Sequence, residues 1–344
     1  MNWNRNQNIY DNVLESIGLT PLIRLKKISQ DCQADICVKL EYTNPSGSLK
    51  DRVVYAIVEK AEQRGDLKPG MTLLEGTTGN TGIATAMVGA AKGYPVIIVM
   101  PEGMTEERKK TIQAYGARLV LTPGAETDVD LVLEEVERLK AEYGDKIFEI
   151  GQFERQENLQ AHIENTAPEI WEQTGGHLDA FIMCQGTGGT VTGTAKYLKE
   201  KNSAIKIFIS EPAESPILAH GKIGGHKIQG IADGLIPPIL DLDYIDGMIL
   251  VSSEESIKTA QEITKKEGIF CGISSGCNVA AALKLARKYP QLERIVTIVN
   301  DNGLRYLSTE LCGSTVNRIP LDREYILSPE NQAKLKGYQF EIIE

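Results

Sequence analysis

The sequence lacks the patterns that hold structural metals or disulfides. Its 344 residues include six cysteines and four histidines, yet no C-x-x-C pair and no H-E-x-x-H motif occurs. A zinc site is therefore not predicted, and no metal ion is expected. Isolated cysteines in a reducing compartment stay as thiols and commonly fill small spaces in a core. We therefore expect free thiols and a cytoplasmic location.

Basic residues and long apolar runs are also scarce. Lys and Arg total 37 against 47 Asp and Glu, which gives a net charge of −10. A field of this sign repels a phosphate backbone, so nucleic acid is not an expected partner. The longest apolar stretches, such as 83–91, are far shorter than the roughly 20 residues that cross a bilayer. The opening residues, MNWNRNQNIYDNV, contain no apolar signal core. No membrane partner is expected.

Short β-branched runs alternate with helical segments along most of the chain. Continuous apolar strands separated by helices are typical of parallel sheets covered on both faces, so the expected fold class is α/β. Segment 210–243 is rich in Gly and Pro and has no helical period, which is typical of a functional loop. Strands are expected near 72–74, 95–100, 118–121, 147–150, 180–183, 205–209, 248–251 and 295–299, and helices near 80–92, 105–115, 129–143, 158–172, 191–201, 254–267 and 275–288.

One lysine stands directly before a helical run. The segment NPSGSLKDR places Lys50 at the start of VVYAIVEKAEQR. The positive end of the helix dipole disfavours a cation there and favours a neutral amine, which can form a Schiff base. The alternative is an ordinary surface lysine after a turn.

Three further loops carry glycines and hydroxyls between a strand and a helix. Loop 75–82 (EGTTGNTG) offers amide and threonine groups to a carboxylate or phosphate, or is simply a capped turn. Loop 186–190 (GTGGT) suits one phosphate group, because it matches neither the dinucleotide nor the nucleoside triphosphate fingerprint. Loop 271–276 (CGISSG) places two serines where either could cap the next helix. Together with Lys50, these loops fit pyridoxal 5'-phosphate, which has a phosphate, a carbonyl and a ring nitrogen.

The sequence resembles the pyridoxal-phosphate β-family, called fold type II. Within that family it is similar to the cysteine synthase and cystathionine β-synthase group. The resemblance runs from about residue 17 to 308, and its motifs occur in the family order. They read SIGLTPLIRL, NPSGSLKDR, TTGNTG, MPEGMTEERKKTIQAYGARLVLTP, GQFE, GTGGT, EGIFCGISSG and RYLST.

The resemblance implies a role for each loop. Lys50 forms the Schiff base and later moves the α-proton of the substrate. Asn80 contacts the ring hydroxyl of the cofactor, and Ser274 faces its pyridine nitrogen. The phosphate is held by Gly186, Thr187, Gly188, Gly189 and Thr190, and the substrate carboxylate by Thr77, Thr78, Gly79, Thr81 and Gln152.

The resemblance also implies the architecture and the assembly. It implies two domains, each a mostly parallel twisted sheet with helices on both faces. Residues 46–155 would form a smaller mobile domain that closes over the substrate. Residues 1–45 and 156–315 would form the larger cofactor-phosphate domain, and 316–344 a C-terminal extension. A homodimer is usual in the family.

The implied chemistry is β-replacement on L-serine or L-cysteine derivatives through an aminoacrylate intermediate, as in cysteine synthases. A serine at the ring nitrogen is a weaker proton source than a carboxylic acid, which favours rapid loss of a β-substituent. Sulfide would be the nucleophile or the leaving group, and a small amino acid the substrate. A cystathionine β-synthase-like reaction and a non-catalytic protein of the same fold are the alternatives, although Lys50 and the GTGGT loop are intact.

The sequence departs from the family at three places. Segment 230–237 reads GIADGLIP where cysteine synthases read roughly G-I-G-A-G-F-I-P, so Asp233 replaces a small apolar residue. Asp233 either faces solvent or caps a turn, or it is a general base that activates water. In the latter case L-cysteine would yield L-serine and hydrogen sulfide, as in a cysteine lyase. Thr78 stands where relatives have serine, and 300–303 (NDNG) replaces a Pro-Ser-Gly type run.

Overall fold

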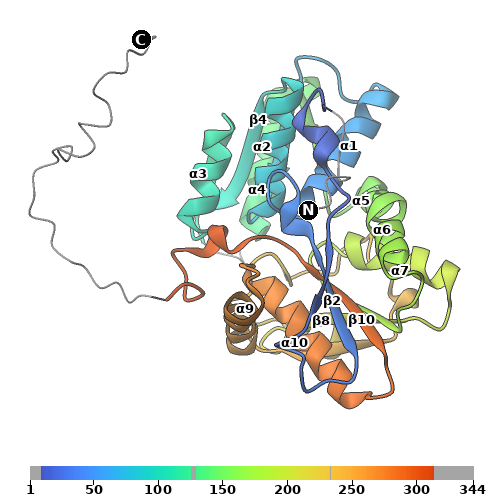
Figure 1. The fold of residues 1–344 in the computed structure, drawn as a ribbon. Helices are drawn as coiled ribbons and strands as arrows, with labels where there is room; N and C mark the ends of the chain where they lie inside the picture. Colours follow the sequence, from blue (N-terminus) through green and yellow to red (C-terminus); the bar gives the residue numbers. More distant parts are fainter. Residues whose placement is uncertain (1–8, 125–128, 233, 314–344) are drawn as a thin grey trace, which may run out of the picture. The chain divides into compact units, whose positions relative to one another are not determined.

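The computed structural model describes residues 9–124, 129–232 and 234–313 (Figure 1). The chain divides into a compact unit, Met1–Cys312, and a second unit, Gly313–Glu344. The architecture below is that of the first unit. The extension expected at 316–344 lies outside the described residues, as does Asp233.

The larger sheet has six strands in the order β1-β2-β10-β7-β8-β9. Only the edge strand β1 runs antiparallel, to β2, and the other neighbours are parallel. Strands β2, β7 and β10 are buried along most of their length, which is why they read as continuous apolar runs. The strands are β1 (Leu22–Leu25), β2 (Asp35–Leu40), β7 (Ala180–Cys184), β8 (Lys206–Pro212), β9 (Gly247–Val251) and β10 (Arg294–Val299).

The smaller sheet has four parallel strands in the order β5-β4-β3-β6. Successive residues of a strand point to opposite faces, and here both faces are apolar. Leu73 and Ile98 pack with the helices of one face, while Leu74 and Ile97 pack with α4 on the other. The strands are β3 (Thr72–Gly76), β4 (Val96–Pro101), β5 (Arg118–Thr122) and β6 (Ile147–Glu149).

Helices cover both sheets, and Figure 1 shows α9 and α10 on one side of the larger sheet and α6 and α7 on the other. The α/β fold class with two mostly parallel sheets is confirmed, while the domain boundaries stay a prediction. The helices are α1 (Lys50–Arg64), α2 (Asn80–Lys92), α3 (Glu106–Ala114), α4 (Val129–Tyr143), α5 (Gln156–Ala161), α6 (Ala167–Gln173), α7 (Gly189–Lys201), α8 (Ile217–His220), α9 (Ser253–Glu267) and α10 (Ile273–Lys288).

Two local features differ from the sequence-based expectation. Strands β1 and β2 were not among the expected elements, because DICVKL carries charge at both ends of a short apolar run. The helix expected over 158–172 is interrupted by a π-helical turn at His162–Thr166. Pro168, the second residue after this turn, has no N–H for an ordinary helical bond, which accounts for the wider turn.

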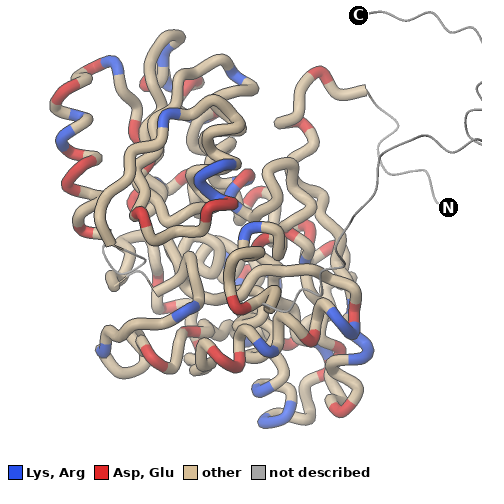
Figure 2. Tube along the Cα trace, turned by 90° about the vertical axis from the view of Figure 1, so that its left-hand side faces the viewer, with Lys and Arg blue, Asp and Glu red and all other residues tan. Residues whose placement is uncertain are grey.

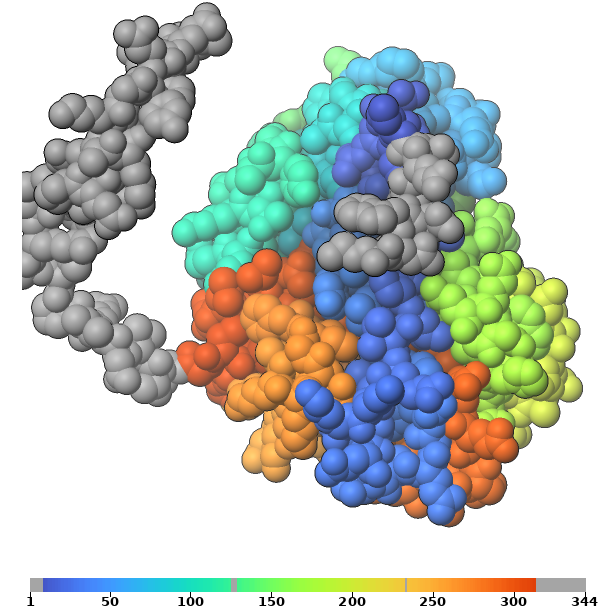
Figure 3. Space-filling view, in the orientation of Figure 1, coloured from blue at the N-terminus to red at the C-terminus, as the bar shows by residue number. Residues whose placement is uncertain are grey.

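The surface carries both signs of charge, and distant segments share a face. Figure 2 shows acidic and basic residues interspersed along the trace. In Figure 3 the chain near residue 305 lies beside α3, and the Thr105 hydroxyl donates to the carbonyl oxygen of Arg305 at 2.8 Å.

Among the described residues no helix has the length and apolarity to span a membrane. All six cysteines are free thiols, and four of them are buried.

A buried ion network fixes the start of α1. The guanidinium of Arg52 donates to both oxygens of Glu41, at 2.8 and 2.9 Å, and to both oxygens of Glu169, at 2.7 and 2.8 Å. Lys39 of β2 completes the network with a 2.7 Å contact to Glu169. Burial alone would raise the pKa of Glu41, but the charge and hydrogen bonds of Arg52 outweigh it and hold that pKa well below its ordinary value. The network joins β2, α1 and α6.

Removing one charge from this network should destabilise the fold. Glu41→Gln keeps the side-chain shape but leaves Arg52 and Lys39 with Glu169 as their one remaining anion in the network, so one buried positive charge is uncompensated. We therefore expect a loss of about 3 kcal/mol in the free energy of unfolding. Urea denaturation at pH 7 measures it. Glu172→Gln, at an exposed position of α6, is the matched control.

The same variant should change the pH dependence. Because the folded pKa of Glu41 is depressed, its contribution is present above the ordinary glutamate pKa, about 4.3, and is lost as the pH falls below that value. The stability gap between wild type and Glu41→Gln should therefore narrow in acid. A gap that stays constant from pH 7 to pH 3 would contradict this account.

Candidate active site

Loops that follow the parallel strands of both sheets line two neighbouring cavities. Ligands bind at the carboxyl ends of strands in open α/β sheets, and here the loops after β3, β7 and β10 lie at such ends. The space inside the two cavities, open solvent included, is about 550 and 420 Å³. They share the lining residues Lys50, Asn80, Gly186, Thr187 and Gly230.

Lys50 is the first residue of α1 and borders both cavities. The turn before it is held by Asp51, whose carboxylate accepts the backbone N–H of Ser46 at 2.6 Å and also the Ser46 hydroxyl. The guanidinium of Arg305 donates to the carbonyl oxygens of Ser46 and Gly47 from the other side. The position of Lys50 is therefore set by two side chains that are far apart in the sequence, Asp51 and Arg305.

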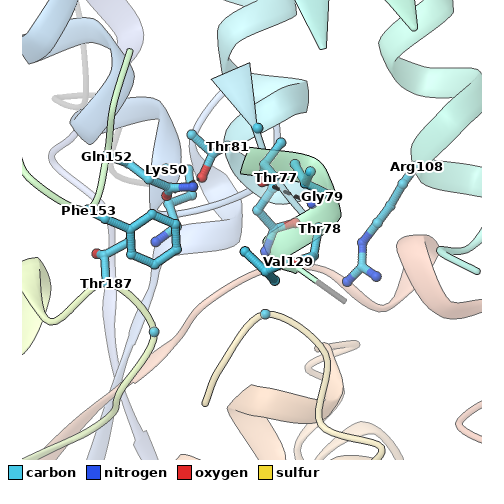
Figure 4. Close-up of a pocket in the computed structure, with 15 residues that line it drawn as sticks. Lys50, Thr77, Thr78, Gly79, Thr81, Arg108, Val129, Gln152, Phe153 and Thr187 are labelled. Carbon is cyan, nitrogen blue, oxygen red and sulfur yellow. Dashed lines mark hydrogen bonds between the residues drawn. The ribbon is translucent and has the colours of Figure 1, made fainter. Parts of the chain in front are cut away.

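The loop after β3 presents threonine and amide groups to the first cavity (Figure 4). The Thr81 hydroxyl donates to Oε1 of Gln152 at 2.6 Å, which orients that amide. The Arg108 side chain packs directly against Gly79, where a Cβ would lie 2.5 Å from Cδ and Nε of Arg108. Glycine is therefore required at 79, and α2 begins immediately after it at Asn80.

Glu75 lies buried beneath this loop. Its Oε2 accepts the backbone N–H of Gly151 at 3.0 Å, next to Gln152. Burial, and secondly the charge of Glu149, raise the pKa of Glu75 to about 8. At neutral pH most of this group is therefore protonated and uncharged. A neutral Glu75 does not repel a carboxylate bound at the loop above it.

The loop after β7 turns sharply into α7. Gly188 has φ +81°, in the left-handed region that favours glycine, and α7 begins at Gly189. The Asn158 amide donates to Thr187 Oγ1 at 3.0 Å and to the carbonyl oxygen of Gln152 at 2.8 Å. Asn158 therefore couples this loop to the one that carries Gln152. The N-terminal amides of a 13-residue helix lie at this end of the second cavity.

A neutral histidine supports the first turn of α7. His162 Nε2 lies 3.1 Å from Thr190 Oγ1, and its Nδ1 lies 2.9 Å from Thr166 Oγ1. Burial lowers the pKa of His162 to about 3, so the imidazole carries no charge at neutral pH. Its role here is a hydrogen bond rather than a charge.

Polar side chains from three elements close the second cavity. Asn80 donates from Nδ2 to Asp301 at 2.8 Å, while its buried Oδ1 has no hydrogen-bond partner among the described residues. Ser274 lies in the first turn of α10 and accepts a hydrogen bond from Asn300 at 3.0 Å. Helix α10 begins at Ile273, so neither serine of the CGISSG loop is its N-cap.

Cys184, the last residue of β7, also lines the second cavity. Burial raises the pKa of its thiol far above the ordinary value. The amide of Asn300 donates to its sulfur at 3.2 Å.

The structure brings together nearly all of the residues expected from the sequence. Gly189 does not line either cavity but begins α7, and Asp233 lies outside the described residues. Arg108 and Phe153 also line the first cavity and were not predicted, although both lie within motifs that carry the family resemblance. No role was predicted for Asn300. The first cavity is lined by Thr77, Thr78, Gly79, Thr81 and Gln152, the second by Gly188, Thr190 and Ser274, and both by Lys50, Asn80, Gly186 and Thr187.

Comparison with known proteins assigns the family. The sequence profile of the family described as pyridoxal-phosphate dependent enzyme matches residues 13–301. The chain belongs to this family. It is 44% identical over 302 residues to a cysteine synthase of Staphylococcus aureus (strain Mu50 / ATCC 700699), covering 88% of this chain and 96% of that protein.

Two solved structures have the same fold. One is a hydrogen sulfide-producing enzyme from Fusobacterium nucleatum, with a TM-score of 0.84 and 39% identity over 87% of this chain and 100% of that one. The other is a cysteine synthase from Entamoeba histolytica, with a TM-score of 0.85 and 42% identity over 91% and 94% of the two chains. The cofactor of the enzyme is therefore pyridoxal phosphate.

The residues that line the cavities fit this cofactor. The unpartnered Oδ1 of Asn80 is an acceptor for the ring hydroxyl. The glycine-rich turn and the amides of α7 suit a phosphate dianion. The Ser274 hydroxyl offers a hydrogen bond to the ring nitrogen, and the amine of Lys50 borders both cavities.

The phosphate loop should not tolerate a side chain at its helix start. A Cβ at Gly189 would overlap the buried Asn158 carboxamide, which would then release Thr187. Gly189→Ala is therefore expected to weaken cofactor binding at least tenfold, measured by titrating the apoenzyme with pyridoxal phosphate. Gly225→Ala, where a Cβ meets nothing within 4 Å, is the control. Equal affinities of the two variants would refute this assignment.

Proposed function

We propose that the enzyme replaces the β-substituent of an L-serine or L-cysteine derivative, with sulfide as the nucleophile or the leaving group. The observation that carries this proposal is the placement of Lys50 at the border of both cavities, one with the features of a carboxylate site and the other with those of a phosphate site. The 44% identity to a cysteine synthase supports the same reaction class.

In this proposal each loop has one task. Thr77, Thr78, Gly79, Thr81 and Gln152 bind the α-carboxylate of the amino acid. Gly186, Thr187, Gly188, Gly189 and Thr190 bind the cofactor phosphate, Asn80 the ring hydroxyl and Ser274 the ring nitrogen. These contacts would fix the Cα–H bond of the substrate relative to the Lys50 amine.

Lys50 would hold the cofactor through its carbonyl and, once released from it, would move the α-proton of the substrate. When bound, the cofactor withdraws electrons from Cα, which makes the α-proton acidic and allows the β-substituent to leave. The amine of Lys50 takes that proton and returns it to Cα after the nucleophile has added to Cβ. The neutral Glu75 beneath the loop keeps the site favourable for the carboxylate.

Sulfide release from L-cysteine is the second candidate. Asp233 replaces a small apolar residue of cysteine synthases. A carboxylate there would be a general base that activates water, giving L-serine and hydrogen sulfide. The 39% identity to a hydrogen sulfide-producing enzyme supports this reading. A cystathionine β-synthase-like reaction, the remaining alternative, would further need a site that binds homocysteine.

We further propose a cytoplasmic homodimer in which residues 46–155 close over the substrate. Six unpaired thiols favour a reducing compartment. Size-exclusion chromatography with light scattering would measure the assembly, and a monomeric mass would refute the dimer.

A product assay separates the two reactions. With O-acetyl-L-serine and sulfide, a cysteine synthase-like enzyme should form L-cysteine. With L-cysteine as the only substrate, sulfide with stoichiometric L-serine would assign water as the nucleophile. Pyruvate would instead indicate simple elimination, and lanthionine a second cysteine as nucleophile. No turnover in either assay by cofactor-loaded enzyme would refute β-replacement.

Asp233→Asn tests the general base. The amide keeps the size of the side chain but cannot accept a proton, so L-serine formation should fall about 10²-fold or more. Cysteine synthesis should change far less, because sulfide needs no base. Asp241→Asn, six residues before the start of strand β9 and outside these two cavities, is the control. Wild-type L-serine formation by Asp233→Asn would demote Asp233 to a structural residue.

A further inference from the structure

Two buried asparagines connect the main chain of the larger sheet to Ser274. Oδ1 of Asn278 accepts the backbone N–H of Cys184 at 2.7 Å, and its Nδ2 donates to the carbonyl oxygen of Ile298 at 2.8 Å. The same Nδ2 lies 3.4 Å from Oδ1 of Asn300, whose Nδ2 lies 3.0 Å from Oγ of Ser274. Relative exposure is 0% for Asn278, 3% for Asn300 and 4% for Ser274.

The direction of these hydrogen bonds is fixed at the main chain. A backbone N–H can only donate and a carbonyl oxygen can only accept. The Cys184 N–H and the Ile298 oxygen therefore leave the Asn278 amide a single orientation. Its Nδ2 then faces Asn300, which must turn its own oxygen toward Asn278. The donor side of Asn300 consequently faces Ser274 Oγ and Cys184 Sγ.

The Ser274 hydroxyl has one proton, and the hydrogen bond from Asn300 determines the direction in which that proton can be donated. Ser274 Oγ accepts the hydrogen bond from Asn300, so its own proton cannot be directed at that amide. Ser274 Oγ donates no hydrogen bond to any other described residue, and Ser274 lines the second cavity. The proton is thus available to an acceptor bound in the cavity.

We propose that Asn300, oriented by Asn278, is a positioning residue that holds the Ser274 hydroxyl as a donor toward the cofactor ring nitrogen. A ring nitrogen that accepts this bond is unprotonated. The inference rests on the proposed placement of that nitrogen at Ser274. It also gives a role to the NDNG departure at 300–303, which the family pattern left unexplained.

A packing role and a polarity role for Asn300 predict opposite orders of variants. Asn300→Asp keeps the shape but replaces the donor by an oxygen, so Ser274 would turn its proton toward the carboxylate and away from the cavity. Asn300→Ala removes the donor without supplying an acceptor, and leaves the hydroxyl able to rotate. If Asn300 directs the Ser274 proton, Asn300→Asp should weaken cofactor binding more than Asn300→Ala does. If Asn300 only fills space, Asn300→Ala should weaken cofactor binding more.

The measurement is the dissociation constant of pyridoxal phosphate for the apoenzyme at pH 9. That pH is about five units above the ordinary aspartate pKa, so a buried carboxylate is ionised. We expect the dissociation constant to rise on the order of tenfold in Asn300→Asp and about threefold in Asn300→Ala. Asn302→Asp, in the same turn but bonded through Oδ1 to the Leu304 N–H, should change it little.

A double-mutant cycle with Ser274→Ala tests whether Asn300 acts through the serine. In that background both Asn300 substitutions should lose their effect on cofactor affinity. If Asn300→Asp does not fold, as judged by melting of the apoenzyme, the cycle with Asn300→Ala gives the answer. The proposal would be overturned if Asn300→Ala weakened cofactor binding more than Asn300→Asp. It would also be overturned if the Asn300 substitutions kept their full effect on cofactor affinity in the Ser274→Ala background.

Failure of the underlying placement has a different signature. If Ser274→Ala alone leaves the affinity unchanged, the ring nitrogen does not lie at Ser274, and both the placement and the inference fall. If Ser274→Ala weakens binding while the Asn300 variants bind like wild type, the placement stands and only the role of Asn300 is refuted.

Discussion

The four-charge network around Arg52 is the constraint on which the site depends. Arg52 lies two residues after Lys50. Its bidentate contacts with Glu41, directly after the end of β2, and with Glu169 of α6 connect the first turn of α1 to both elements. Two cations and two anions balance, so the network carries no net charge into the interior. Guanidinium–carboxylate pairs are directional as well as strong. They therefore fix the orientation of α1 as well as its position. The Lys50 amine is thereby placed by ion pairs whose residues line neither cavity.

The remaining groups of the site come from strand ends, and a second set of side chains holds these ends together. Asn158 joins the glycine-rich turn to the Gln152 loop, and Asp301 accepts from Asn80. Two buried titratable groups behind these loops carry little charge, because Glu75 is mostly protonated and His162 is neutral. Apart from Lys50 and Arg108, the polar side chains of the described residues that line the cavities are amides, hydroxyls and the Cys184 thiol. Such groups keep their hydrogen-bonding directions over a wide pH range.

The sequence predicts the fold class and the four loops because their signals are local. Buried parallel strands read as apolar runs, and a glycine turn before a helix has its own composition. Strand β2 was missed because it pairs with β10, far along the chain, and β1 was missed because it is a short edge strand that pairs only with β2. The π-turn at His162 depends on one proline. Residues such as Arg108 and Asn300 carry no local signature, since their roles arise from contacts across 121 residues to Gln229 and 26 residues to Ser274.

The placement of Cys184 has a consequence for selectivity. A thiol at the wall of a cavity could in principle compete with any external nucleophile. Only the thiolate attacks, however, and burial keeps this group in the thiol form at physiological pH. The protein can therefore carry sulfur beside a site proposed to handle sulfide without reacting with its own substrate. Cys184 is therefore unreactive because its thiol stays protonated and not because it is far from the cavity.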